Sequence, residues 1–185
     1  DDNMLAITND GRKAALDMRM ILPNDPSGPT KVDVAAGLIH RIWEETRENE
    51  YLDPATGLLS ETRGALQLVF ADLSTPNSEK WNVYEELRLQ LIVHGMPAES
   101  VRFIHEARND REKAQLFAAA RAGHIAVLVG STERMGVGTN VQARAVALFH
   151  LDCPWRPSDI AQREGRIMRQ GNQNETVGII RLITE

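Results

Sequence analysis

From residue 66 onward, short apolar segments alternate with amphipathic ones. The apolar segments, which we interpret as buried strands, are 66–71, 101–105, 125–130, 145–152 and 176–184. The amphipathic segments between them predict helices over 78–95, 109–123 and 157–171. Apolar strands that alternate with helices favour a parallel sheet with helices on both faces. We therefore expect an α/β domain over residues 61–185.

Residues 1–60 predict a helical extension and linker. Segment 30–49 has apolar positions at Ala35, Leu38, Ile39 and Ile42, which share one helical stripe and should pack on the sheet domain. Segment 22–30 is rich in proline and predicts a connector, and segment 50–64 is rich in turn-forming residues. We expect 50–64 to be a mobile loop.

Composition narrows the class of protein. The 185 residues are 42% hydrophobic and carry a net charge of −5, which is ordinary for a soluble domain and disfavours a protein that coats nucleic acid over its whole surface. No apolar run approaches the roughly 18 residues that span a membrane, so we expect a cytoplasmic protein without a membrane partner.

We expect no metal site, because the single cysteine, Cys153, and the histidines lack zinc-ligand spacing. Cys153 should also be unreactive. Both ends of the sequence look cut from a longer chain.

The predicted helix 157–171 raises the first chemical question. At about 100° per residue, Gln162, Arg166 and Arg169 share a stripe roughly 60° wide, while Gly165 costs about 1 kcal/mol relative to alanine inside a helix. Two guanidiniums one turn apart can bind phosphate oxygens, and a glycine beside them lets a ligand approach closely. A solvated basic face is the alternative, and this segment alone does not decide between them.

The loop 131–142 raises the second question. It follows a predicted strand and contains Ser131, Thr132, Gly136, Gly138 and Asn140. In open α/β sheets, ligands bind at the carboxyl ends of strands, where such a loop can offer backbone N–H groups to phosphate. It is not a Walker loop, because the chain contains no G-x-x-x-x-G-K-[ST] pattern. It is not a complete dinucleotide fingerprint either, because the third glycine is missing. A structural crossover is the other interpretation.

Taken together, "GSTERMGVGTNVQ", "AVALFHLDCPW" and "PSDIAQREGRIMRQGN" resemble motifs V and VI of superfamily 2 helicases and translocases in the Swi/Snf-like branch. Segment "LQLVFADLSTP" stands where motif IV would. The residues of these motifs are most similar to those of the large helicase proteins of phages and mobile elements, some of them fused to DNA methylases. The matching positions are Ser131, Thr132, Gly136, Gly138, Asn140, Asp152, Trp155, Pro157, Gln162, Arg166 and Arg169.

The resemblance implies the C-terminal RecA-like lobe of an ATP-dependent enzyme. It implies that Arg169 is the arginine finger, that Arg166 is its companion and that Gln162 couples the nucleotide to motif V. Gly136, Gly138 and Asn140 join them as nucleotide contacts. ATP and Mg²⁺ would be held mainly by an N-terminal RecA-like lobe of the same parent chain, since this sequence has no Walker loop and no Asp-Glu pair. No role is assigned to Arg163 and Glu164.

DNA is the second expected partner. We expect its backbone to lie across residues 131–142 and 105–111, where Ser131, Thr132, Asn140, Arg108 and Arg111 supply hydrogen bonds and charge. Loops 72–78, 131–142 and 153–158 should lie at one edge of the sheet. Two other classes remain open: a RecA-like scaffold without ATP coupling, and a methyltransferase with a Rossmann-like sheet.

Overall fold

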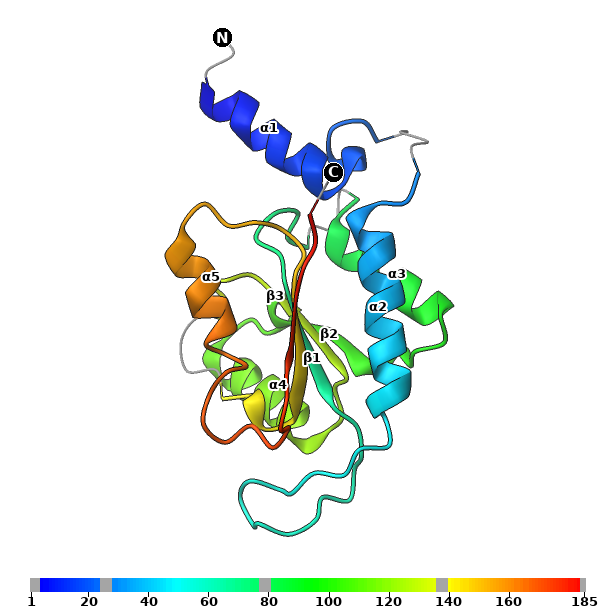
Figure 1. Ribbon diagram of the computed structural model, residues 1–185, viewed down its shortest axis with the longest axis vertical. Helices are drawn as coiled ribbons and strands as arrows, with labels where there is room; N and C mark the ends of the chain where they lie inside the picture. Colours follow the sequence, from blue (N-terminus) through cyan, green and yellow to red (C-terminus); the bar gives the residue numbers. More distant parts are fainter. Residues whose placement is uncertain (1–3, 24–27, 77–80, 136–139, 184–185) are drawn as a thin grey trace.

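A five-stranded parallel sheet forms the centre of the molecule. In the computed structural model, which describes residues 4–23, 28–76, 81–135 and 140–183, the strand order is β2-β3-β1-β4-β5 and every neighbouring pair is parallel (Figure 1). The strands are β1 (Leu66–Phe70), β2 (Val101–Phe103), β3 (Val127–Gly130), β4 (Ala145–His150) and β5 (Gly178–Arg181). The α/β fold with a parallel sheet is therefore confirmed, and each strand is shorter than its apolar segment.

Helices cover both faces of the sheet, as expected. On one face, α2 (Lys31–Thr46) and α3 (Val83–Val93) pack through Ile39 and Leu87 on Val69, Val129 and Phe149. On the other face, α4 (Asp110–Ala122) packs through Phe117 on Phe70, Leu128 and Leu148. Alternate strand residues thus enter opposite cores, which explains why the strands are apolar throughout.

Local signals set the helix boundaries. Asn109 caps the start of α4 by accepting from the amide of Glu112, and Gly123 ends it in the left-handed conformation with φ of 89°. Thr30 and Asp33 form a capping box at the start of α2, whose buried side includes Ala35 and Ile39. The expected packing of the 30–49 helix on the sheet domain is confirmed.

The first helix, α1 (Met4–Leu16), lies at the carboxyl edge of the sheet (Figure 1). Arg12 Nη2 donates to the carbonyl oxygen of Cys153 at 2.9 Å, and its guanidinium lies over the ring of Trp155. Leu16 is buried in the same core as α2. A domain boundary at residue 60 stays a prediction.

The expectation of one helix over 157–171 is wrong. Helix α5 is Pro157–Glu164, and Gly165 is its C-cap. Beyond it the chain tightens into i to i+3 turns, in which the amide of Arg166 donates to the carbonyl of Arg163 and that of Ile167 to Glu164. The low helix propensity of glycine and the burial of Ile167 in the core explain the change of direction.

The segment 50–64 is held by specific bonds rather than being free. Arg144, which is 1% exposed, donates to the carbonyls of Thr62, Gly64 and Arg121 and to the hydroxyl of Ser60. At the start of the segment, the Gln173 side chain makes two bonds to the backbone of Leu52. These bonds anchor the segment and do not support the expectation of a mobile loop, which rested on composition alone.

Candidate functional site

Three parallel strands bring their carboxyl ends together at one edge of the sheet. The residues that follow β1, β3 and β4 include Asp72, Thr132 and Asp152. The amide of Thr132 donates to Oδ1 of Asp72 at 2.6 Å, and the amide of Asp72 donates to Oδ2 of Asp152 at 2.6 Å. The three predicted loops do start at this edge, although residues 77, 78 and 136–139 lie outside the described part of the chain.

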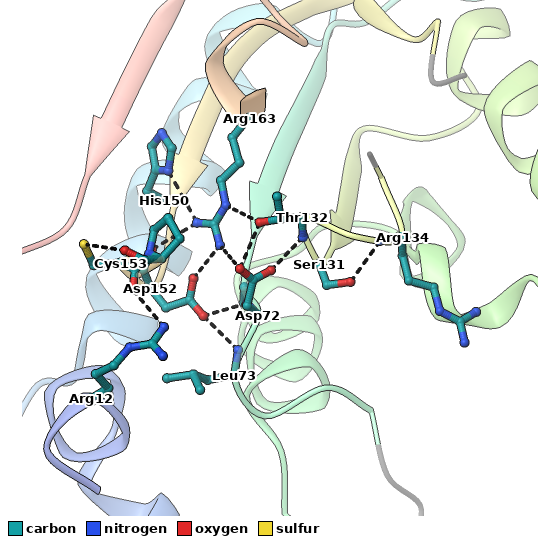
Figure 2. A network of polar contacts seen from close by, with 12 residues as sticks. Arg12, Asp72, Leu73, Ser131, Thr132, Arg134, His150, Asp152, Cys153 and Arg163 are labelled. Carbon is teal, nitrogen blue, oxygen red and sulfur yellow. Dashed lines mark hydrogen bonds and ion pairs between the residues drawn. The ribbon is translucent and has the colours of Figure 1, made fainter. Parts of the chain in front are cut away.

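Arg163 of α5 is the centre of this edge (Figure 2). Its side chain is fully buried, with Nε 2.7 Å from Oγ1 of Thr132 and Nη2 2.8 Å from Asp72 and 2.9 Å from Asp152. Nη1 donates to the carbonyl of Asp152 and faces Nδ1 of His150 at 3.4 Å. All five N–H donors of the guanidinium therefore have a partner, as a buried cation requires.

A second chain of contacts links β4, α5 and β5 behind Arg163. Nε2 of His150 lies 3.1 Å from Glu164, which also accepts from Arg181. Because Nδ1 faces a guanidinium, which can only donate, the network assigns the proton of His150 to Nε2. Burial and the Arg163 guanidinium lower the pKa of His150 below its ordinary value of 6.5.

A polar cleft of about 530 Å³ opens beside this network. Gln162, Ser131 and Thr132 all line it, and their predicted roles stay predictions. The lining residues are Asp72, Thr75, His105, Ser131, Thr132, Glu133, Arg134, Asp159 and Gln162. The cleft can therefore offer hydroxyl, amide, carboxylate and cationic groups to a ligand.

The hydrogen bonds in the cleft distinguish its two hydroxyl residues. Thr132 uses its amide and its Oγ1 hydrogen on Asp72 and accepts from Arg163 on the same oxygen, so it has no donor left for a ligand. Ser131 only accepts, from the amide of Arg134, and within the described residues its hydroxyl hydrogen has no acceptor. Ser131 is therefore the hydroxyl that can donate into the cleft.

His105 adds an imidazole to the same wall. Its Nδ1 is buried and has no hydrogen-bond partner among the described residues. Its ring stands edge-on to Tyr84 at 5.2 Å between centroids. Burial and the nearby Arg134 lower the pKa of His105, so the neutral form is favoured in the folded protein.

Arg166 and Arg169 lie in the turns after α5. Burial and the charge of Arg169 lower the pKa of Arg166, which places the two guanidiniums within electrostatic reach of each other. Within the described part of the chain, neither guanidinium has a carboxylate or carbonyl partner. Gln142, at the end of the loop that begins with Ser131, donates to the carbonyl of Gln170 at 3.0 Å. The turn with the two arginines thus lies beside the end of that loop.

The remaining predicted site residues are more dispersed. Asn140 lines a different pocket, with Asp53 and Arg121, and its carbonyl accepts from Arg121. Arg108 and Arg111 are exposed at the start of α4. Gly136 and Gly138 lie outside the described residues. In the described part of the chain no group of three His, Cys, Asp or Glu side chains is arranged for a metal.

The sequence patterns predict no role for Arg163, Asp72 or His150, which the structure brings together at this edge. A signal for Arg163 was present, because Ile160, Arg163 and Ile167 are spaced three and four apart and so share the buried stripe of the predicted helix. An arginine on an apolar stripe needs buried acceptors. The acceptors are Asp72 and Asp152, and they meet Arg163 only because β1 and β4 are neighbours in the sheet.

Comparison with known families identifies the domain. The model of the helicase conserved C-terminal domain matches residues 52–171, which is more than half of the chain. The chain belongs to this helicase family. None of the curated proteins matches. The match begins before β1 and ends just after Arg169, so Arg163 and the polar cleft are parts of a helicase C-terminal domain.

Solved helicase structures share the fold. The C-terminal part of the Fun30 ATPase domain matches with a TM-score of 0.56 and 21% identity, over 84% of this chain and 41% of that one. The Escherichia coli DEAD-box protein SrmB, solved with RraA, matches with a TM-score of 0.52 and 17% identity, over 83% of this chain and 69% of that one. Saccharomyces cerevisiae Dbp5, solved with RNA and ADP BeF3, matches with a TM-score of 0.51 and 17% identity, over 84% of this chain and 32% of that one. The chain therefore spans about two fifths of the Fun30 structure. Among the described residues, no helix is long and apolar enough to cross a membrane.

Proposed function

We propose that this helicase C-terminal domain is the second motor lobe of an ATP-dependent DNA helicase or translocase of the Swi/Snf-like branch, from a phage or mobile element. Its ATP site would be shared with an N-terminal RecA-like lobe of the same protein. The observation that carries the proposal is the pair Arg166 and Arg169, two neighbouring guanidiniums that have no acidic partner among the described residues. Among the described residues, the other buried or half-buried arginines are bonded to carboxylates or carbonyls: Arg12, Arg19, Arg88, Arg102, Arg121, Arg144 and Arg163.

The residues present fit one side of a nucleotide site. Unpaired guanidiniums can neutralise charge on phosphate oxygens, and Arg169 would act as the arginine finger on the γ-phosphate with Arg166 as its companion. Gly136, Gly138, Asn140 and Gln162 stay predicted nucleotide contacts. The phosphate loop and the Mg²⁺ ligands must come from the other lobe, because this sequence contains no Walker loop. We expect the chain alone not to hydrolyse ATP.

The nucleic acid would lie along the polar cleft and the start of α4. Ser131 can donate to a phosphate there, and the exposed Arg108 and Arg111 add positive charge. Dbp5 was solved with RNA, so RNA has to be compared with DNA as the activating strand.

The test is nucleic-acid-stimulated ATP hydrolysis by the complete protein. Arg169→Ala should lower turnover by about 10³–10⁵-fold, because an arginine finger acts mainly on the transition state. Arg169→Lys should rescue poorly, since lysine lacks the planar fork. Arg156→Ala, which changes an exposed arginine at the start of α5, is the control and should leave turnover intact.

Two results would count against the proposal. Unchanged turnover in Arg169→Ala would mean that the arginine pair is a solvated basic surface. A complete protein that binds nucleic acid or a protein partner without any ATP turnover would favour the non-enzymatic scaffold instead.

A further inference from the structure

We infer that Arg163 is the positioning residue that connects the cleft at Thr132 with the turn that carries Arg166 and Arg169. The inference rests on the proposed function and adds a path between its two predicted sites. The family resemblance assigns a coupling role to Gln162 instead. Gln162 is exposed and, among the described residues, makes no hydrogen bond to Ser131 or Thr132.

The path has only two hydrogen bonds. Nε of Arg163 donates to Oγ1 of Thr132 at 2.7 Å, and the carbonyl of Arg163 accepts from the amide of Arg166 at 3.0 Å. A displacement of the Thr132 backbone by a ligand in the cleft would therefore reach Arg166 through one residue.

The guanidinium is held too firmly to absorb such a displacement by rotating. Asp72 and Asp152 each accept from Nη2, and Asp152 also accepts from the amides of Asp72 and Leu73. With all its donors committed in a buried site, Arg163 cannot shift without breaking several charge-assisted bonds. Movement at Thr132 and movement of α5 are thus linked.

Arg144 offers a matched comparison at the opposite edge of the sheet. It is equally buried and is bonded to backbone carbonyls of segment 50–64 and α4, with no bond to Thr132 or α5 among the described residues. The same substitution in both arginines keeps the positive charge and removes the planar fork. Arg144→Lys therefore controls for general loss of stability.

The first experiment measures amide hydrogen exchange of this chain. Thr132→Val, which removes the hydroxyl and keeps the side-chain size, should speed exchange of the amides of residues 165–168 by about tenfold or more, and Thr132→Ser should restore protection. Arg144→Lys should speed exchange near Gly64 and leave residues 165–168 protected. Unchanged exchange at 165–168 in Thr132→Val would overturn the inference, whether or not the protein hydrolyses ATP.

The second experiment uses the complete protein and compares ATP turnover with and without a saturating DNA strand. Arg163→Lys should lower the ratio of stimulated to basal turnover by about tenfold or more, while Arg144→Lys should keep the wild-type ratio. An equal fall in both variants, or a preserved ratio in Arg163→Lys, would reject the coupling role. A wild-type protein without ATP turnover would refute the proposed function, and the coupling role with it, whereas the exchange result would still report the contact itself.

Discussion

Nη2 of Arg163 lies 2.9 Å from Oδ1 of Asp152, and both side chains are almost completely buried, at 0% and 2% exposure. The pair joins the second residue after β4 to α5, and Asp152 simultaneously accepts from the amides of the two residues Asp72 and Leu73 that lie beyond β1. Buried ion pairs contribute little over a well-packed apolar substitute, but breaking one by removing a single partner is expensive. The pair therefore makes the geometry of this edge sensitive to single substitutions.

We predict that Asp152→Ala lowers the free energy of unfolding by about 3–5 kcal/mol, because it breaks a buried ion pair of Arg163 and leaves the amides of Asp72 and Leu73 without their carboxylate acceptor. Urea unfolding followed by circular dichroism measures the change. Asp110→Asn is the control: it removes an exposed carboxylate from the first turn of α4, and its cost should stay below about 1 kcal/mol. Similar midpoints for the two variants would contradict the prediction.

A second prediction concerns the segment 50–64. Arg144→Met should free it, because the substitution removes the donors that bind Ser60, Thr62 and Gly64. Hydrogen bonds of a charged group contribute about 1.5–3 kcal/mol each, so the open form should become at least about tenfold more populated. Limited proteolysis with trypsin, read at Arg63, measures this opening.

The exposed Arg41 on α2 provides the comparison for that experiment. Arg41→Met removes an equal charge without touching the segment, and cleavage at Arg63 should stay at the wild-type rate. If Arg144→Met were also cleaved at the wild-type rate, other contacts, such as those of Gln173 with Leu52, would hold the segment.

The sequence was sufficient to predict the fold, but not the polar network around Arg163 at the carboxyl edge of the sheet. Continuous apolar strands and amphipathic helices are local patterns, and they correctly indicated the parallel sheet and a helix over 109–123, which the structure shows as α4 between its caps Asn109 and Gly123. Asp72 and Asp152 are 80 residues apart and meet only because β1 and β4 are neighbours, which no local pattern encodes.

The end of α5 shows the opposite failure. The helical periodicity of the sequence continues through Gly165, whereas α5 ends at Glu164 and Ile167 is buried in the core that contains Leu148. Tertiary packing overrode the local pattern. As a result, the predicted stripe of Gln162, Arg166 and Arg169 is split between a helix and the turns after it.

The third prediction is that acid destabilises the domain through His150. The pKa of His150 is lowered in the folded state, so between 6.5 and that lower value the unfolded chain binds a proton that the native protein does not. Stability is therefore present above about pH 6.5 and falls as the pH drops through this window. Protonation would also turn Nδ1 into a donor facing Arg163.

Unfolding midpoints at pH 8 and pH 5.5 test this dependence. His150→Asn, which keeps an acceptor near Arg163 but does not titrate, should reduce the difference between the two midpoints. His105 titrates in the same direction, so part of the difference should remain. His124→Asn, at an exposed histidine, should keep the full wild-type difference; an unchanged difference in His150→Asn would show that His150 is not responsible.

The last prediction separates the two hydroxyls of the cleft. Ser131→Ala should weaken nucleic-acid binding by the complete protein about fivefold to tenfold, because a hydroxyl donor to a phosphate is worth about 1 kcal/mol or somewhat more. Thr132→Val, which removes the other hydroxyl, should leave affinity nearly unchanged, since both donors of Thr132 are already used on Asp72. Neither variant changes charge, so the salt dependence of binding should keep its slope, whereas Arg108→Ala and Arg111→Ala should each reduce that slope by about 1 if they bind phosphates. Fluorescence anisotropy over a salt series gives both quantities. A large loss in Thr132→Val with none in Ser131→Ala would mean that the Asp72 bonds open when nucleic acid binds and that the hydroxyl of Thr132 makes the contact.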